Sequence, residues 1–216
     1  MVKNIAKKVL GCGPISRFPV KVRKGLAKGA WWTLFPVSAN WRSGGGHPEI
    51  DETILKYACQ PGIVAWDLGA HFGIYTIGMA RRVGGTGQVV AFEPDAVSRA
   101  RLELHIGRNK LNNVVVIAAA ASSNYGTGVL LQYGDFGNTT SHLAFPGENT
   151  LAVPLKAAIS CVAADGLVAA GKIRLPQFAK IDVEGHGGKA LEGMSCSLTK
   201  SRPVMLMAFH GGDENI

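Results

Sequence analysis

Cysteines, long apolar stretches and, near the N-terminus, acidic side chains are all scarce in this sequence. None of the four cysteines belongs to a Cys-x-x-Cys pair, which argues against a zinc cluster or a disulfide framework. The longest apolar run, Val114 to Ala121, falls short of the roughly 18–20 residues that cross a bilayer. No apolar segment of signal-peptide length precedes Gly11. We therefore expect a cytoplasmic protein without a transmembrane segment.

Acidic residues are missing from the first 48 positions, so the charge is uneven along the chain. Residues 1–48 hold nine Lys and Arg and no acid, whereas residues 49–216 hold fourteen Lys and Arg against fifteen Asp and Glu. The net charge of +8 is thus the sum of +9 and −1. We expect two parts: a basic, aromatic-containing arm over residues 1–48 and a main domain over residues 49–216.

The basic arm is compatible with more than one partner. Val2, Ile5, Val9 and Leu10 fall on one helical face with lysines opposite, a pattern that fits a helix packed on its own domain or, as the alternative, peripheral contact with an anionic membrane. Its charge also suits nucleic acid, but the rest of the chain has no basic surplus, which makes nucleic acid the weaker alternative. The aromatic end of the arm predicts docking onto the main domain; these residues are Trp31, Trp32, Phe35, Pro36 and Trp41.

From about residue 62 onward, short apolar strands alternate with helical stretches. This alternation predicts an α/β fold with a parallel sheet covered by helices on both faces. The expected strands are Ile63–Leu68, Gln88–Glu93, Val114–Ala121, Phe178–Val183 and Val204–Phe209, and the expected helices are Gly73–Val83, Val97–Lys110 and Lys189–Leu198. Between the third and fourth strands, Val129–Leu131 and Leu151–Leu155 flank a polar loop at 137–141 and predict an inserted β-hairpin.

The strongest chemical signal is the segment Asp67-Leu-Gly-Ala-His-Phe-Gly73, where the first strand turns into the first helix. Glycine there lets the backbone approach a ligand, and the helix N-terminus adds N–H donors. Glu93 ends the next strand, where a carboxylate can accept both hydroxyls of a ribose. Loop and acid together predict a nucleoside-cofactor pocket at the carboxyl ends of the strands.

The glycine spacing distinguishes between two kinds of cofactor. A dinucleotide site prefers Gly-x-Gly-x-x-Gly, whereas this loop reads Gly69-x-x-x-Gly73 with Asp67 in front of it. A carboxylate in that place repels a pyrophosphate but suits the cationic amino-acid end of S-adenosylmethionine. The motif therefore favours a methyl donor, with an NAD(P)-linked oxidoreductase as the alternative.

The segment Lys180-Ile-Asp-Val-Glu-Gly-His186 ends the fourth strand at the same edge of the sheet. Strand alternation predicts that the side chains of Asp182 and Glu184 share one side. We predict that Asp182, Glu184 and His186 are the catalytic candidates, one of which takes the proton of an acceptor hydroxyl. His210, which ends the fifth strand, is a further candidate, and the sequence leaves open whether the two carboxylates hold a metal ion.

Together these three segments resemble FkbM-type S-adenosylmethionine-dependent methyltransferases, over roughly Gly44 to His210. The resemblance implies a class I methyltransferase fold, which is Rossmann-like, and O-methylation of a hydroxyl on a sugar, glycan or natural product. It also implies which residues contact S-adenosyl-L-methionine: Glu93 at the ribose, and Asp67, Gly69, Ala70 and Gly73 around the donor. To these we add His71, which lies inside the loop.

The sequence also departs from the resembled family in ways that predict altered specificity or weakened activity. Gly187 and Ala208 stand where members often carry an acid. A class I sheet normally ends in an antiparallel strand pair beside the fifth strand, but only six residues follow His210, so we expect that pair to be lacking. The apolar fifth strand then has an open edge, which predicts oligomerisation through it or cover by Trp31, Trp32 and Phe35.

Overall fold

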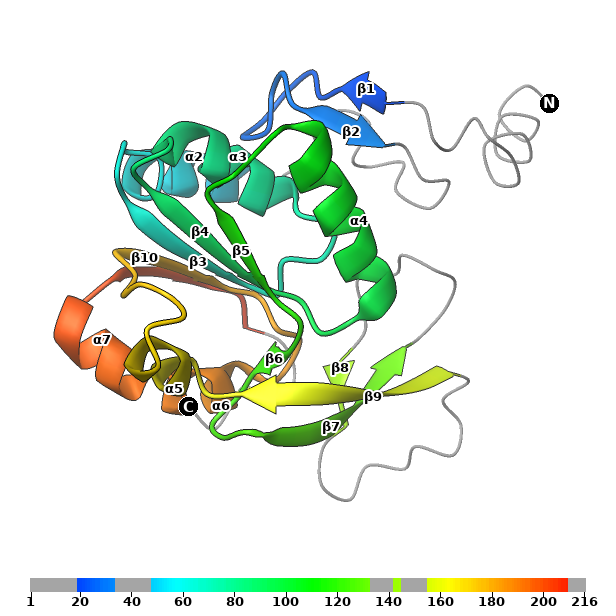
Figure 1. The fold of residues 1–216 in the computed structure, drawn as a ribbon, viewed down its shortest axis with the longest axis vertical. Coiled ribbons are helices and arrows are strands. Elements are labelled where there is room, and N and C mark those ends of the chain that lie inside the picture. The colour runs from blue at the N-terminus through cyan, green and yellow to red at the C-terminus, as the bar shows by residue number, and fades with distance from the viewer. Residues whose placement is uncertain (1–18, 34–47, 133–141, 145–154, 210–216) are drawn as a thin grey trace.

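The computed structural model describes residues 19–33, 48–132, 142–144 and 155–209. Its central sheet has five parallel strands in the order β11-β10-β3-β4-β5 (Figure 1). Their bounds are β3 (Val64–Leu68), β4 (Gln88–Phe92), β5 (Val114–Ile117), β10 (Phe178–Ile181) and β11 (Val204–Met207). The strand order reverses between β3 and β10, and ligands of such sheets bind where the order reverses, at the carboxyl ends. The predicted α/β class and its parallel sheet are confirmed.

Helices cover both faces of this sheet (Figure 1). On one face lie α2 (Pro48–Tyr57), α3 (Ile74–Val83) and α4 (Ala96–Arg108), and on the other lie α5 (Ala164–Ala169), α6 (Gly187–Glu192) and α7 (Ser195–Ser201). Ile54 and Ile77 pack into the first core, whereas Leu167 and Met194 pack into the second. All five residues of β3 are buried as a result, which explains its continuously apolar character apart from Asp67.

The predicted strand Val114–Ala121 is wrong as a single element. β5 ends at Ile117, and β6 (Ala120–Ala121) belongs to a second sheet of order β6-β9-β7-β8. The break has a simple cause: β4 ends at Phe92, which pairs with Ile117, so the chain has no further partner in the first sheet. An uninterrupted apolar run gives no sign of such a change of sheet.

The inserted hairpin is confirmed, and it forms most of the second sheet. β7 (Gly126–Gln132) pairs antiparallel with β9 (Leu155–Val162) and with the short β8 (His142–Leu143). The predicted return strand overlaps β9 only at Leu155, and residues 151–154 and the polar loop 137–141 lie outside the described residues.

The predicted helix Lys189–Leu198 is two short helices, α6 and α7, separated at Gly193. A Cβ atom at Gly193 would lie 1.8 Å from the carbonyl oxygen of Ser122, so the chain turns at this contact with the segment after β6. A helix-period pattern does not reveal such a close approach between distant segments.

The described part of the basic arm forms an antiparallel hairpin of β1 (Pro19–Lys21) and β2 (Trp31–Thr33). Leu26 and Trp32 pack into the same core as α3, and the Trp32 ring stacks on His105 of α4 at a centroid distance of 3.7 Å. The predicted docking is therefore confirmed for Trp32. The apolar helical face at residues 2–10 and the aromatic residues at 35, 36 and 41 lie outside the described residues.

The suggested cover of the fifth strand by this hairpin is wrong for Trp31 and Trp32. β2 packs against α4, and both the N–H and the C=O of Trp31 bond to the Asn109 side chain at the end of that helix. Within the described part of the chain, β11 is the outermost strand of its sheet, and Val204 and Met205 are exposed. Oligomerisation through this edge stays a prediction.

No helix among the described residues is both long and apolar enough to span a membrane.

His105 links the hairpin to the loop after β3. Its Nε2 accepts a hydrogen bond from the N–H of Thr33 at 3.1 Å, and its Nδ1 lies 2.8 Å from the carbonyl oxygen of Phe72. These two bonds require the neutral ring, with the proton on Nδ1. Burial lowers the pKa of His105 to about 4, which keeps the ring neutral at physiological pH.

Replacing His105 should therefore destabilise the fold. His105→Leu leaves two buried backbone groups without partners and should lower the free energy of unfolding by about 2–4 kcal/mol at pH 7 in a urea titration. The unfolded parent takes up a proton on His105 more readily than the folded parent does, so the parent loses stability as the pH falls from about 6.5 towards 4. The difference in the free energy of unfolding between parent and variant should therefore become smaller over this range. Leu104→Ala, on the exposed side of the same helix, is the matched control. A variant as stable as this control would contradict the linking role.

Candidate functional site

Two loops meet at the carboxyl edge of the sheet, one after β3 and one after β10. Gly69 has a φ of +83°, and a Cβ there would lie 1.9 Å from the carbonyl oxygen of Asp182. Gly73 has a φ of +88°, and its Cβ would lie 2.3 Å from Leu102. Packing inside the protein thus already requires both glycines. The contact also fixes Asp182 directly beside the glycine loop.

A pocket opens above these loops, with an empty volume of ≈ 1050 Å³ counted to its open mouth. Its walls come from the loop after β3, the end of β4, the turn after β10 and the second sheet. The structure brings eight of the nine residues predicted for the site into this lining: Gly69, Ala70, His71, Gly73, Glu93, Asp182, Glu184 and His186. Asp67 is the exception.

Glu93 lies at the end of β4, and only 6% of it is exposed. Its Oε2 accepts a hydrogen bond from the N–H of His71 at 2.7 Å, and its Oε1 accepts one from the N–H of Asp95 at 2.9 Å. Burial raises the pKa of Glu93 to about 7, although both backbone donors favour the charged form. The carboxylate is thus rigidly oriented at the pocket wall, with acceptor capacity left on each oxygen.

Asp67 lies beneath the pocket rather than in its lining, because its side chain is fully buried. Its Oδ2 accepts a hydrogen bond from the Thr76 hydroxyl at 2.6 Å, and its Oδ1 is 3.4 Å from Nζ of Lys180. The expectation that Asp67 directly faces the cationic end of a ligand misses this intervening ammonium group. Residue spacing could not show that a lysine covers the carboxylate.

Lys180 is the charged centre that the sequence prediction missed. Its Nζ lies 3.4 Å from Asp67 and 3.2 Å from Oδ2 of Asp182, and 5.2 Å from the centroid of the Tyr75 ring. Burial disfavours its charge, but the two carboxylates outweigh this effect and raise the pKa of Lys180. It stays protonated and holds Asp182 at the pocket wall. A lysine in the otherwise apolar strand Phe178–Ile181 was the available signal.

The turn after β10 corrects the predicted arrangement of the catalytic candidates. The strand ends at Ile181, and Glu184 and Gly185 have positive φ values of 43° and 76°. The N–H of His186 donates to the carbonyl of Val183 at 3.2 Å, which closes a tight turn. Strand alternation therefore does not extend to Glu184, and a tight turn rather than a strand brings it to the pocket that Asp182 also lines. A non-glycine residue in this conformation is strained, a feature typical of functional sites.

Histidine positions in the site differ in their surroundings. Nε2 of His186 lies 3.0 Å from the Ser122 hydroxyl. The His71 ring stacks on Phe72 at a centroid distance of 3.8 Å, and burial lowers the pKa of His71 to about 4. His210 lies outside the described residues. Within the described ranges, no group of three or more His, Cys, Asp or Glu side chains could hold a metal ion.

Part of the lining comes from residues outside the nine that the sequence predicts for the site. Trp32 of the hairpin, Tyr75 of α3 and, from the second sheet, Leu130 and Leu143 all contribute to it. These residues reach the pocket through packing between segments far apart in the chain. The aromatic cluster at the end of the basic arm was the one available sequence signal for Trp32.

Comparison with known proteins identifies the class to which this fold and pocket belong. The model of the methyltransferase FkbM domain matches residues 67–215, more than half of the chain. The chain therefore belongs to the FkbM methyltransferase family, whose members are S-adenosylmethionine-dependent enzymes. This assignment favours the methyl donor over NAD(P).

Individual relatives are distant. The hexuronic acid methyltransferase AglP of Haloferax volcanii is 25% identical over 185 residues, which are 85% of this chain and 71% of that protein. A crystal structure of a methyltransferase FkbM from Methylobacillus flagellatus KT is 20% identical, with a TM-score of 0.49, over 68% of this chain and 32% of the other. A putative rRNA methylase from Clostridium thermocellum is 14% identical with a TM-score of 0.41, over 75% and 68%. The chain thus spans about a third of the solved FkbM protein.

Proposed function

We propose that this protein transfers the methyl group of S-adenosylmethionine to a hydroxyl oxygen of a sugar, with a uronic acid or a glycan that contains one as the acceptor class. The observation that carries the proposal is the oriented carboxylate of Glu93, held by two backbone donors at the carboxyl end of β4, beside the glycine loop. The name of the relative AglP, a hexuronic acid methyltransferase, supports the acceptor class.

The pocket residues fit this donor. Glu93 has acceptor capacity for the two ribose hydroxyls, which is the role that a strand-end acid has in nucleoside sites. Pro94 and Asp95, from the same strand end, and Ala120 and Ala121, from β6, also line the pocket, so a mainly apolar surface is available for a flat base. Bound there, the donor supplies an electrophilic methyl group.

Asp182 is the residue we propose to take the proton of the acceptor hydroxyl. Its backbone contacts Gly69, so it is the candidate placed directly beside the donor loop. Its carboxylate is held by Lys180, and about a third of its side chain remains exposed. A fixed carboxylate that reaches solvent can both orient a hydroxyl and take up its proton.

Glu184 and His186 then form the wall around this position. Glu184 is in the strained turn, and Nε2 of His186 lies 3.0 Å from the hydroxyl of Ser122, which directly follows β6. Their placement suits contacts with the remaining oxygens of a sugar. Positioning the hydroxyl in line with the methyl group can supply about 7–11 kcal/mol of the barrier to such a displacement.

A labelling experiment tests the acceptor class. The protein is incubated with methyl-labelled donor and either the methyl glycoside of glucuronic acid or that of glucose. The label should enter the glucuronic acid compound and should resist mild alkali, because a methyl ether survives treatment that hydrolyses a methyl ester. Label that alkali releases would show a methyl ester on the carboxyl group and would contradict methylation of a hydroxyl. Equal labelling of both glycosides would contradict the uronic acid preference.

A further inference from the structure

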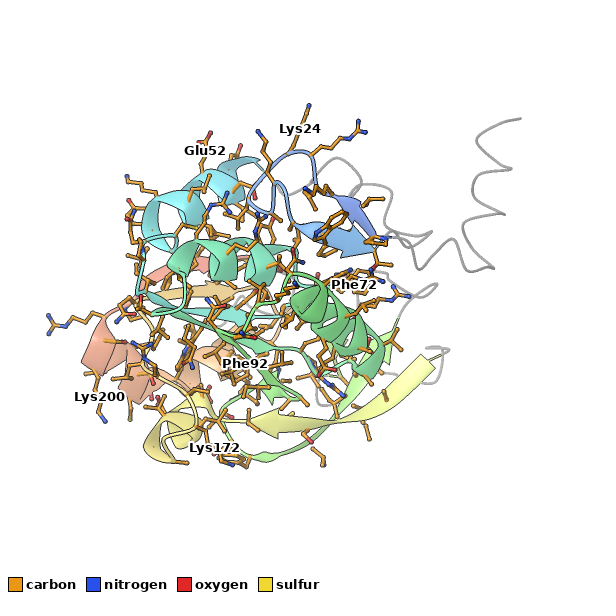
Figure 2. All side chains as sticks on the ribbon, turned by 45° about the horizontal axis from the view of Figure 1, so that its top comes forward. Lys24, Glu52, Phe72, Phe92, Lys172 and Lys200 are labelled. Atoms are coloured by element: carbon orange, nitrogen blue, oxygen red, sulfur yellow. The ribbon has the colours of Figure 1, made fainter. Side chains whose placement is uncertain are left out.

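Trp32 stands out among the described residues 19–33 because it alone of them lines the pocket. Its side chain is 1% exposed and its ring is stacked on His105. His105 in turn bonds to the carbonyl oxygen of Phe72, a pocket residue that lies where the hairpin meets α4 (Figure 2). The indole is thereby fixed in place against the glycine loop.

The indole N–H of Trp32 is buried, and no described residue accepts a hydrogen bond from it. Indole nitrogen can only donate, and a buried donor without an acceptor is unfavourable. Such groups are rare in native structures and call for an explanation. An acceptor that arrives with a ligand provides one, because the residue lines the pocket.

The first turn of α3 adds donors to the same pocket. Its N-cap, Gly73, has no side chain to cap the helix, and the first turn contains no acidic residue. Gly73, Ile74 and Tyr75 all line the pocket. The N–H of Gly73 already donates to the carbonyl oxygen of Ala70 at 2.9 Å, so the N–H of Ile74 and the positive end of the helix dipole are the features that favour an anion there.

We infer that the indole N–H of Trp32 and the first turn of α3 form a subsite for a carboxylate of the bound ligand. The inference rests on the proposed function, which provides two carboxylates: that of the amino-acid part of the donor and that of a uronic acid acceptor. The family match begins at residue 67, so the hairpin that carries Trp32 precedes it. Trp32 is then a ligand-binding residue that the matched domain does not include.

Nuclear magnetic resonance of the indole N–H groups tests this subsite without depending on a variant that folds. The Trp32 signal is assigned by its loss in Trp32→Phe. Trp66 is an internal reference, because its indole N–H already donates to the carbonyl of Arg174 at 3.0 Å. Three probes are added in turn: S-adenosylhomocysteine, methylthioadenosine, which lacks the amino-acid part, and the methyl glycoside of glucuronic acid.

A downfield shift of the Trp32 signal with S-adenosylhomocysteine but not with methylthioadenosine assigns the donor's carboxylate. A shift with the glucuronic acid glycoside but not with S-adenosylhomocysteine assigns the acceptor's carboxylate. Either result supports the inference, and the Trp66 signal should stay in place. A shift that methylthioadenosine reproduces in full overturns the carboxylate assignment.

Calorimetry separates the inference from the function on which it rests. Trp32→Phe should weaken, about tenfold, the binding of the probe that shifts the Trp32 signal. Thr33→Val is the matched control: it removes a buried hydroxyl of the next residue that has no described partner and does not line the pocket. If S-adenosylhomocysteine binds but the Trp32 signal does not respond to any probe, the subsite is overturned and the proposed function stands. If S-adenosylhomocysteine does not bind, both are overturned.

Discussion

Asp182→Asn should lower turnover by about 10²- to 10⁴-fold, while binding of S-adenosylhomocysteine changes little. The amide keeps the shape of the side chain but cannot take up a proton. It also retains an oxygen towards Lys180, which lies 3.2 Å from the carboxylate in the parent. Steady-state kinetics with saturating donor, together with calorimetry of donor-product binding, measures both quantities.

Comparison with neighbouring variants makes the assignment of the base specific. Glu184→Gln and His186→Gln should raise the KM for the acceptor more than they lower kcat, because we place these residues around the sugar. Glu192→Gln, at an exposed ion pair on α6, is the control for loss of a carboxylate near the turn. An Asp182→Asn enzyme with full turnover, or a larger kcat loss in Glu184→Gln, would contradict the role proposed for Asp182.

Glu93→Gln should weaken binding of S-adenosylhomocysteine by about 10- to 100-fold and at the same time stabilise the ligand-free fold at high pH. The pKa of Glu93 is raised from 4.5 to about 7, so the folded parent binds a proton more tightly than the unfolded chain does. Stability from this group is therefore fully present below pH 4.5 and is lost as the pH rises through about 7.

The sign of this effect gives a measurable trend. Glutamine does not titrate, so the free energy of unfolding of Glu93→Gln relative to the parent should increase by about 3 kcal/mol between pH 4 and pH 8. Urea titrations over this range measure it, with Glu103→Gln on the exposed side of α4 as control. If the difference in the free energy of unfolding does not change with pH, burial does not raise the pKa of Glu93 and this part of the account is wrong.

The elements that carry the cofactor loop could be predicted because their signals are local. Apolar runs that end at Asp67 and Glu93, with glycines following the first, indicated where strands stop and which edge they share. The change of sheet after Ile117 could not be predicted in this way, because it depends on where β4 ends rather than on any property of residues 114–121.

The site was predictable in its membership but not in its internal order. Residue type and strand position brought Glu93, Asp182 and His186 to one edge, as expected. Whether a carboxylate faces the pocket or lies beneath a lysine depends on the side chains stacked across neighbouring strands, as with Asp67 and Lys180. The contribution of Trp32 depends on packing between segments more than 70 residues apart, for which the sequence contains no periodic signal.

The claim that the pocket holds a methyl donor is tested most directly by calorimetry of the parent protein with S-adenosylhomocysteine and, separately, with NADH. We predict binding of one S-adenosylhomocysteine per chain, weakening as the pH falls below about 7 because the Glu93 carboxylate then becomes protonated. We predict no binding of NADH. Absence of S-adenosylhomocysteine binding by the folded protein, or tight binding of NADH in its place, would contradict the account.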